Sequence, residues 1–231
     1  MVDINTVYQK ILTLANKEQR GYITPQEFNL LANRAQLEIF ENYFHGIKVA
    51  EMKPKNQMKH ADEVEMLEEK LHPFHVDEAA NTTTASLTLP TNTHKIISIT
   101  RNGNEVTQIN KNQITYTENN PLTKANLTRS IFVREDSGIV TIYPAPSVIT
   151  EQFEVNYYKK PADPNWTYVV VNNKALYNSS ASDAQNFELH SSEEEPLVSR
   201  ILLLAGITIK QPDIQQAGAG SIQLTKQEQN S

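Results

Sequence analysis

The spacing of apolar residues changes twice along the chain, and this limits the folds open to it. Over residues 1–72 apolar side chains recur every three or four positions, which is the period of an amphipathic helix. Over residues 73–190 the period is close to two, as in strands with one buried face. Over residues 191–210 the helical period returns. This order predicts an α+β fold, with an N-terminal helical hairpin or bundle, a central antiparallel β region and a C-terminal helix packed on the bundle.

The N-terminal part contains three stretches with helical spacing. The first, residues 4–15, places most of its apolar residues on one face. The second begins at Pro25 and has an apolar face so wide that it predicts contacts on more than one side. The third, residues 56–71, is strongly charged and stops before "HPF". Residues 1–72 are therefore expected to form a helical bundle.

Turn signals divide the β region. "NGN" at residues 102–104 and Ser-Gly at 137–138 are typical of hairpins. The alternation over residues 86–118 predicts strands on both sides of the first turn, as far as "QITYTE". Residues 153–157 predict another strand, and "YVVVNNKALY" a further short one. Residues 73–190 are expected to be the antiparallel β region.

The C-terminal helix is predicted from residue 191 by a capping box of Ser192 and Glu195. Three consecutive Glu residues there favour the positive end of the helix dipole, and Gly206 marks where the helix should weaken or end. Residues 211–231 have little periodicity and would be disordered alone. We expect them to be an extended assembly tail, with three isolated apolar anchors: Ile214, Ile222 and Leu224.

Residues 16–27 have the outline of a calcium-binding EF-hand loop. Glu27 stands at the twelfth position, but Arg20 occupies the fifth, where calcium needs an anionic oxygen. A turn between two helices explains the same residues. Gly21 would make the turn, Thr24 and Glu27 would form a capping box, and Pro25 would start the next helix. We interpret the stretch as this turn and keep a calcium-binding regulatory module as the alternative.

Composition excludes several classes of protein. The chain has no cysteine, which rules out disulfides, thiolate zinc sites and cysteine nucleophiles. A net charge of −6 argues against a general nucleic-acid binder, because such proteins need an excess of Lys and Arg. No run approaches the length of about 18 apolar residues needed for a membrane span, and the first residues lack the features of a signal peptide. We expect no membrane association.

No pattern indicates catalysis. Glycine-rich phosphate loops and the GxSxG motif are absent, and SxxK has no plausible partner. His72 and His75, with Asp77 and Glu78 nearby, have a spacing that could suit a metal, but they flank a proline and lack a supporting motif. We therefore expect no catalytic, metal-binding or cofactor-binding residues. A nucleic-acid-processing enzyme is a third hypothesis, against which the missing Asp/Glu/His cluster weighs.

The aromatic residues of "NYYKKPADPNW" have two interpretations. With Lys159 and Lys160 they could stack bases and contact phosphates. Alternatively, they belong to a strand with one ring in the core and one at a protein interface. The acidic net charge favours the second interpretation, which assigns Tyr157, Tyr158 and Trp166 to an assembly interface.

Two blocks of sequence resemble virion proteins of tailed bacteriophages. They are "VYQKILTLANKEQRGYITPQEFNLLANRAQLEIFENYF" and "NFELHSSEEEPLVSRILLLAGITIKQPDI", and the middle, with "NYYKKPADPNW", is similar to the same group. The likeness covers residues 4–215. Within this group the chain resembles head-to-tail connectors, the adaptor or ring proteins of the neck, as in short-tailed and crAss-like phages.

This resemblance implies a structural protein that is not an enzyme. It would form a ring, commonly of twelve copies, that joins the portal protein to other neck or tail proteins and extends the DNA channel. Double-stranded DNA would pass without specific binding. The protein would assemble in the bacterial cytoplasm and reside in the virion. Another virion role, in the tail or in head decoration, is the alternative.

Overall fold

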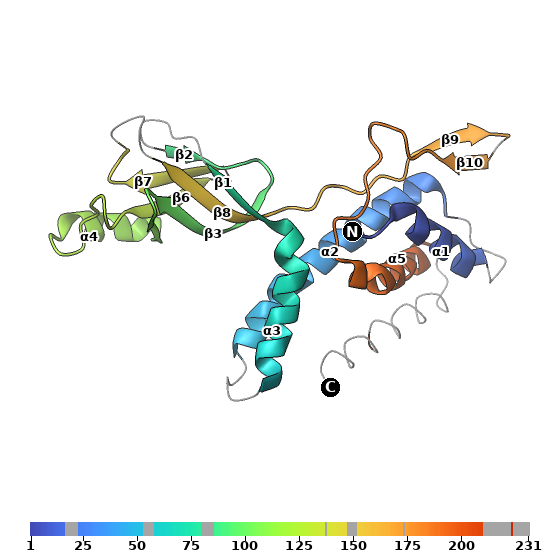
Figure 1. Ribbon diagram of the computed structural model, residues 1–231, viewed down its shortest axis with the longest axis horizontal. Helices are drawn as coiled ribbons and strands as arrows, with labels where there is room; N and C mark the ends of the chain where they lie inside the picture. Colours follow the sequence, from blue (N-terminus) through green and yellow to red (C-terminus); the bar gives the residue numbers. More distant parts are fainter. Residues whose placement is uncertain are drawn as a thin grey trace. The chain divides into compact units, whose positions relative to one another are not determined.

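The computed structural model describes residues 1–16, 23–52, 58–79, 86–136, 138–146, 152–172, 174–209 and 223. The chain divides into two compact units. Unit 1 comprises Met1–Pro73 and Pro161–Ser231, and unit 2 comprises Phe74–Lys160. Unit 2 is thus inserted in the sequence of unit 1. The predicted α+β class is confirmed, with helices at both ends of the chain and antiparallel sheets between them (Figure 1).

Four helices form the body of unit 1. They are α1 (Ile4–Asn16), α2 (Pro25–Met52), α3 (Met58–Leu71) and α5 (Glu194–Ile209). Helix α2 packs against α3 and α5, and α1 packs against α5. Their shared core is apolar and includes Ile4, Val7, Ile11, Phe28, Ala32, Ala35, Phe40, Leu71, Leu197 and Ile201. The wide apolar face of α2 therefore has partners on more than one side.

Helix α2 begins with reciprocal hydrogen bonds between Thr24 and Glu27. The backbone N–H of Thr24 donates to Glu27 Oε2 at 3.0 Å, and the N–H of Glu27 donates to Thr24 Oγ1 at 3.3 Å. Pro25 is the first helical residue, where its missing N–H has no cost. Gly21 lies outside the described residues. The Thr24 N–H, and after it the Thr24 hydroxyl, holds the pKa of the Glu27 carboxyl below its usual range.

The start of α5 differs from the expected capping box. His190 is the N-cap of a 3-10 turn, Ser191–Glu193, and its Nδ1 accepts from the N–H of Ser192 at 3.3 Å. The Glu195 carboxylate does not make the expected capping-box hydrogen bond with Ser192. It binds Lys10 Nζ of α1 at 2.5 Å instead. The helix also continues past Gly206 to Ile209.

Residues 161–190 return to unit 1 as an extended segment held by amide side chains of α2. Gln36 Nε2 donates to the carbonyl oxygen of Ala162 at 2.8 Å, and its Oε1 accepts from the N–H of Glu188 at 3.2 Å. Asn29 Oδ1 accepts from the N–H of Trp166 at 2.9 Å. The segment also contains the hairpin of β9 (Tyr168–Val171) and β10 (Lys174–Tyr177).

Unit 2 contains two four-stranded sheets that enclose one core. The first has the order β1 (His75–Ala79), β8 (Phe153–Lys159), β3 (Thr93–Arg101), β4 (Asn104–Glu105). The second has the order β2 (Ser86–Thr88), β7 (Ile139–Tyr143), β6 (Ile131–Asp136), β5 (Thr107–Gln108). The pairs are antiparallel except β5 with β6. The core consists of Leu87, Leu89, Ile99, Val106, Phe132, Val140, Ile142, Phe153, Val155 and Tyr157.

Two predicted features of unit 2 have different outcomes. The "NGN" turn is confirmed, because Asn102 (φ 49°) and Gly103 (φ 80°) join β3 to β4 in the left-handed conformation of a tight hairpin. The strand predicted at residues 113–118 is wrong. Those residues belong to a short helix, α4 (Ile114–Asn119), preceded by a 3-10 turn in which Gln113 Oε1 accepts from the N–H of Asn110 at 3.3 Å. This local hydrogen bond starts a helix where alternation alone favoured a strand.

Candidate functional site

Two of the aromatic residues predicted at an assembly interface lie in the cores of their units. Trp166 is 1% exposed, its ring centre is 4.3 Å from that of Tyr8, and its Nε1 donates to Asn5 Oδ1 at 3.2 Å. Stacked rings of Tyr168 and Tyr177 cover it further. This corrects the surface assignment of Trp166: its large ring fills unit 1 and has no free face in this structure.

Tyr157 is buried in unit 2. Its hydroxyl is within hydrogen-bond distance of Glu78 Oε2 (3.1 Å) and Asn92 Oδ1 (3.3 Å). Burial, and after it the Glu78 carboxylate, raises the pKa of Tyr157. Its neighbour Tyr158 is only half buried and lies edge-on to the ring of His75. Of the three aromatic residues, only Tyr158 reaches a surface. The other predicted interface residues, Ile214, Ile222 and Leu224, lie outside the described residues.

Several exposed apolar side chains of unit 1 lie on the β9–β10 hairpin. One face of the hairpin holds Tyr168 and Tyr177 against Trp166. Strand alternation places Val169, Val171 and Leu176 on the opposite face, where each is about half exposed. Apolar side chains gathered on a two-stranded hairpin are typical of a contact surface rather than of an isolated stable sheet.

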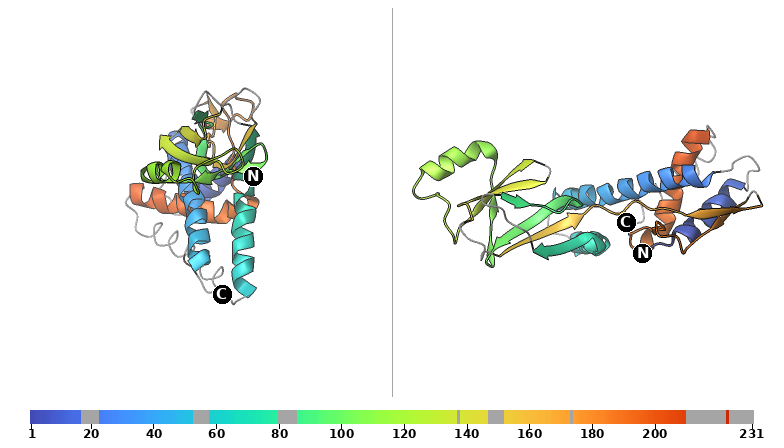
Figure 2. Two further views of the ribbon diagram at one scale, coloured as in Figure 1. Left: turned by 90° about the vertical axis from the view of Figure 1, so that its left-hand side faces the viewer. Right: turned by 90° about the horizontal axis from the view of Figure 1, so that it is seen from above.

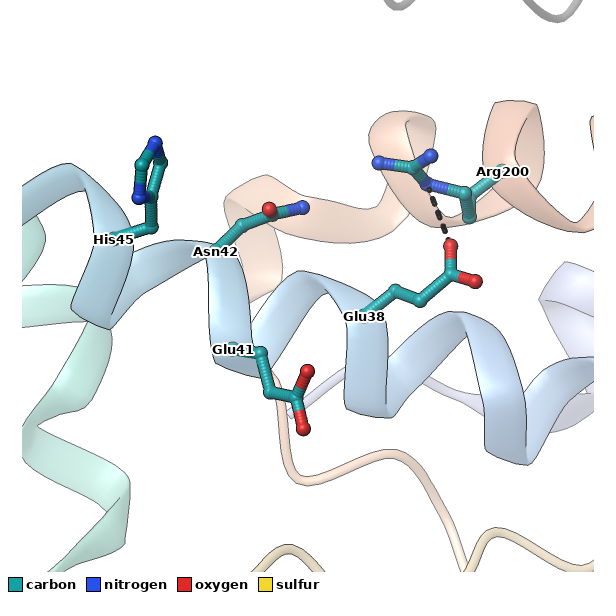
Figure 3. A pocket seen from close by; sticks show the side chains of 5 residues that line it. All are labelled: Glu38, Glu41, Asn42, His45 and Arg200. Carbon is teal, nitrogen blue, oxygen red and sulfur yellow. Dashed lines mark ion pairs between the residues drawn. The ribbon is translucent and has the colours of Figure 1, made fainter.

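A shallow groove of about 360 Å³ lies between α2 and α5 within unit 1. Its lining residues are Glu38, Glu41, Asn42, His45 and Arg200. Figure 3 shows Glu38 and Arg200 facing one another, with Arg200 Nε 3.5 Å from Glu38 Oε2, whereas the Glu41 carboxylate points away from Arg200. The lining contains an ion pair but no hydroxyl or thiol nucleophile.

The acidic residues at the start of α5 form ion pairs with lysines of two other helices of unit 1. Lys10 of α1 lies 2.7 Å from Glu194 and 2.5 Å from Glu195, and Lys70 of α3 lies 2.8 Å from Glu193. The hydrogen bonds that Lys10 donates to Glu194, and then to Glu195, raise the pKa of Lys10. The three Glu residues therefore connect helices in addition to facing the positive end of α5.

Charge is distributed unevenly between the units. Unit 2 contains eight Asp or Glu and eight Lys or Arg, which gives a net charge of zero. The −6 of the whole chain therefore belongs to unit 1. No group of three His, Cys, Asp or Glu among the described residues could hold a metal ion. In the same part of the chain, no helix is both long and apolar enough to cross a bilayer.

The class of protein follows from comparison with known families. The SU10 adaptor protein family has a model that matches residues 13–201. The chain belongs to this family, and it is therefore a phage structural adaptor protein of the virion that interacts with other virion proteins. Among curated proteins, none matches this sequence.

Sequence reasoning missed several residues that organise these surfaces. Asn29 and Gln36 are polar positions among the apolar residues on the core-facing side of α2, and that interruption was the available signal for a polar contact. It did not reveal the segment they bind. The exposed apolar residues around α4 were also missed, because alternation had assigned part of that region to a strand.

Proposed function

We propose that this protein forms a ring in the neck of a tailed phage, where it joins the portal to the tail and extends the DNA channel. The observation that carries the proposal is the match to the SU10 adaptor protein family over residues 13–201. A ring of identical subunits requires two different contact surfaces on each copy. Exposed apolar side chains in both units, at the β9–β10 hairpin and around α4, support such contacts.

The charge of the chain supports passage of DNA through the ring. A channel wall lined by acidic unit 1 would repel phosphates and would let the duplex slide without specific binding. We propose twelve copies per ring and a mechanical role without catalysis, metal or cofactor. Assembly would take place in the bacterial cytoplasm, before the ring is fixed between the portal and the other neck or tail proteins.

Electron microscopy of the intact particle tests this proposal. We expect the chain as a closed ring between portal and tail, with a mass of the isolated ring that corresponds to twelve copies. A location in the tail tube, at the fibre attachment or on the head surface would overturn the neck assignment. A protein that stays monomeric with purified portal and tail would overturn ring formation.

A truncation addresses the assembly tail. Removal of residues 211–231 should leave the circular dichroism and the Trp166 fluorescence of unit 1 unchanged, because the described core ends with α5. It should block assembly of infectious particles. Equal infectivity of the truncated phage would contradict a role of these residues in assembly.

Calorimetry tests the calcium alternative at residues 16–27. We expect no heat of binding with millimolar calcium, because Arg20 occupies a position that requires an anionic ligand. A saturable calcium isotherm that is lost in Glu27→Gln would revive the regulatory hypothesis.

A further inference from the structure

The part of unit 2 between β5 and β6 stands away from the sheets. We call residues 109–130 the α4 arm; it contains the 3-10 turn Lys111–Gln113, α4 and the turns that follow. Figure 1 shows the arm projecting beyond β6 and β7, and the right-hand view of Figure 2 shows the same separation. Within the arm only Ala125 and Ser130 are buried. Packing on the core of unit 2 therefore does not explain its shape.

Hydrogen bonds inside the arm hold its conformation. Asn126 Oδ1 accepts from the N–H groups of Thr128 (3.1 Å) and Arg129 (2.7 Å). The Arg129 guanidinium donates to the carbonyl oxygens of Leu122 (2.7 Å) and Lys124 (3.2 Å). These contacts close the loop on itself, as in a compact Ω-loop.

The base of the arm is fixed to the core of unit 2 by Arg101. This side chain is buried, and its Nη1 donates to Ser130 Oγ at 3.2 Å and to the carbonyl oxygen of Pro144 at 2.9 Å. Ser130 Oγ donates in turn to the carbonyl oxygen of Asn126 at 3.2 Å. The arm is thus arranged before any partner binds, which lowers the entropic cost of docking.

The ordered arm exposes large apolar side chains to solvent. Leu122 and Tyr116, at 83% and 80%, are the most exposed large apolar residues of the described chain, and Leu127 is 60% exposed. Single exposed apolar residues are common, but several on one ordered protrusion mark a contact surface. The arm is also basic, because it carries Lys111, Lys124 and Arg129 against one acidic residue, Glu118.

A surface of complementary chemistry exists on α3 of unit 1. Met66 is 48% exposed there, and Glu69, three residues later on the same side of the helix, is also exposed, as are Glu65 and Glu68. Basic and apolar side chains on the arm therefore match acidic and apolar side chains on α3. We propose that the α4 arm of one copy docks on α3 of a second copy. This inference rests on the proposed ring, because it supplies the two different surfaces that a head-to-tail contact requires.

The contact should depend on salt. Lys111 and Lys124 lie at the surface, and the 3.9 Å approach of Lys111 to Glu135 leaves its side chain largely exposed. Charges of this kind steer association and are screened beyond a Debye length of about 8 Å at physiological salt. The apolar residues at the centre would supply the part of the affinity that salt does not remove.

Site-specific photo-cross-linking tests the proposal. The chain contains no cysteine, so a single introduced cysteine is the only attachment point for the cross-linking probe. A full-length Leu122→Cys variant, labelled with ¹⁵N and carrying a benzophenone maleimide, is mixed with unlabelled cysteine-free protein under assembly conditions. Mass spectrometry should find the probe attached to a peptide of Met58–Leu71 from the unlabelled copy. Capture of that peptide only from the labelled copy, capture of the portal, another protein or DNA alone, or no capture would overturn the proposal.

Ile97→Cys provides the matched control, since Ile97 lies on β3 of the same unit and is 44% exposed but is outside the arm. We expect no capture of α3 from this position. Capture of α3 at equal yield would overturn the specific docking of the arm.

Charge reversal gives a second, independent readout. Lys111→Glu with Lys124→Glu, or Glu65→Lys with Glu69→Lys, should each weaken self-association at least tenfold at low salt, and the two pairs combined should restore it. Unchanged association in both pairs, with an unchanged fold by circular dichroism, would overturn the proposal.

Rings that persist without capture of α3 overturn the docking but not the ring, and capture of α3 in open dimers overturns the ring but not the docking.

Discussion

Lys70 Nζ lies 2.8 Å from Glu193 Oε1, and this ion pair joins the last turn of α3 to the turn that precedes α5. The Glu193 side chain is only 6% exposed. A carboxylate so deeply buried must keep its cation, because loss of one partner leaves an uncompensated charge away from water.

Lys70→Met should lower the free energy of unfolding of unit 1 by about 3 kcal/mol, the lower end of the losses measured when one partner of a buried ion pair is removed. The fluorescence of Trp166 in a urea titration provides the measurement, since this residue is the only tryptophan and lies in the core of unit 1. Lys10→Met is the control. Lys10 pairs with Glu194 and Glu195 at a solvent-exposed site, so its loss should matter much less. Equal effects of the two variants would contradict the prediction.

Tyr43 should make unit 1 less stable at alkaline pH. Burial, and after it the nearby Glu193 carboxylate, raises the pKa of Tyr43 well above its ordinary value. In the unfolded chain this hydroxyl loses its proton near pH 10, while in the folded chain it stays protonated. Its stabilising contribution is therefore complete below about pH 10 and is lost as the pH rises from there toward the folded pKa.

Tyr43→Phe removes this contribution and should flatten the fall in stability between about pH 9 and pH 11. The free energies of unfolding of both proteins, measured at the two pH values, provide the check. Tyr157 and Tyr177, whose pKa values are also raised by burial, are present in both proteins and cancel in the comparison. Identical pH dependence in the two proteins would refute the prediction.

Gln36 should be critical for the return of the chain to unit 1. Its side chain is fully buried and hydrogen-bonds to the backbone of Ala162 and Glu188. Gln36→Ala would leave both backbone groups without this partner and should reduce the stability of unit 1 by about 2–3 kcal/mol. Asn42→Ala is the control on the same helix, because Asn42 is exposed. A loss of similar size at Asn42, where Ala has the higher helix propensity, would show that the effect does not depend on the segment.

The stabilisation that the Thr24–Glu27 cap gives to α2 should depend on pH. The Thr24 N–H holds the pKa of Glu27 below its usual range, so the folded state favours the carboxylate. This contribution is complete above the unfolded pKa of about 4.3 and is lost as the pH falls through the lower folded value. Glu27→Gln should be less stable than the wild type at neutral pH, and this difference should shrink toward about pH 3. Thermal melts at several pH values provide the measurement, and a constant difference would argue against the capping role.

The sequence revealed the features that depend on neighbours along the chain. Helical spacing located α2, and the Asn102–Gly103 turn followed from backbone preferences of two adjacent residues. The burial of Trp166 could not be predicted in this way, because its partners Asn5 and Tyr8 are remote in sequence. Burial of an aromatic side chain depends on which elements meet, and periodicity does not record it.

The α4 arm shows a second limit. Ile114 and Tyr116 alternate with polar residues as in a strand, yet a strand also needs a partner to pair with. The capping contact of Asn110 with Gln113 satisfies the backbone locally, and the helix forms instead. Tyr116 is exposed because this segment forms a helix. The pattern of hydrophobic residues alone does not predict that exposure.

The insertion of unit 2 within the sequence of unit 1 has a consequence for synthesis on the ribosome. Phe74–Lys160 is continuous, so this unit can fold as soon as it leaves the exit tunnel. The helices of Met1–Pro73 emerge earlier, but their binding partners in Pro161–Ile209 are made only after unit 2. The apolar surfaces of α1 and α2 that pack on α5 must therefore stay exposed until Glu194–Ile209 has been made. Met1–Pro73 is made before unit 2 but completes its packing after it, and the time during which it is open to aggregation is set by the speed of elongation.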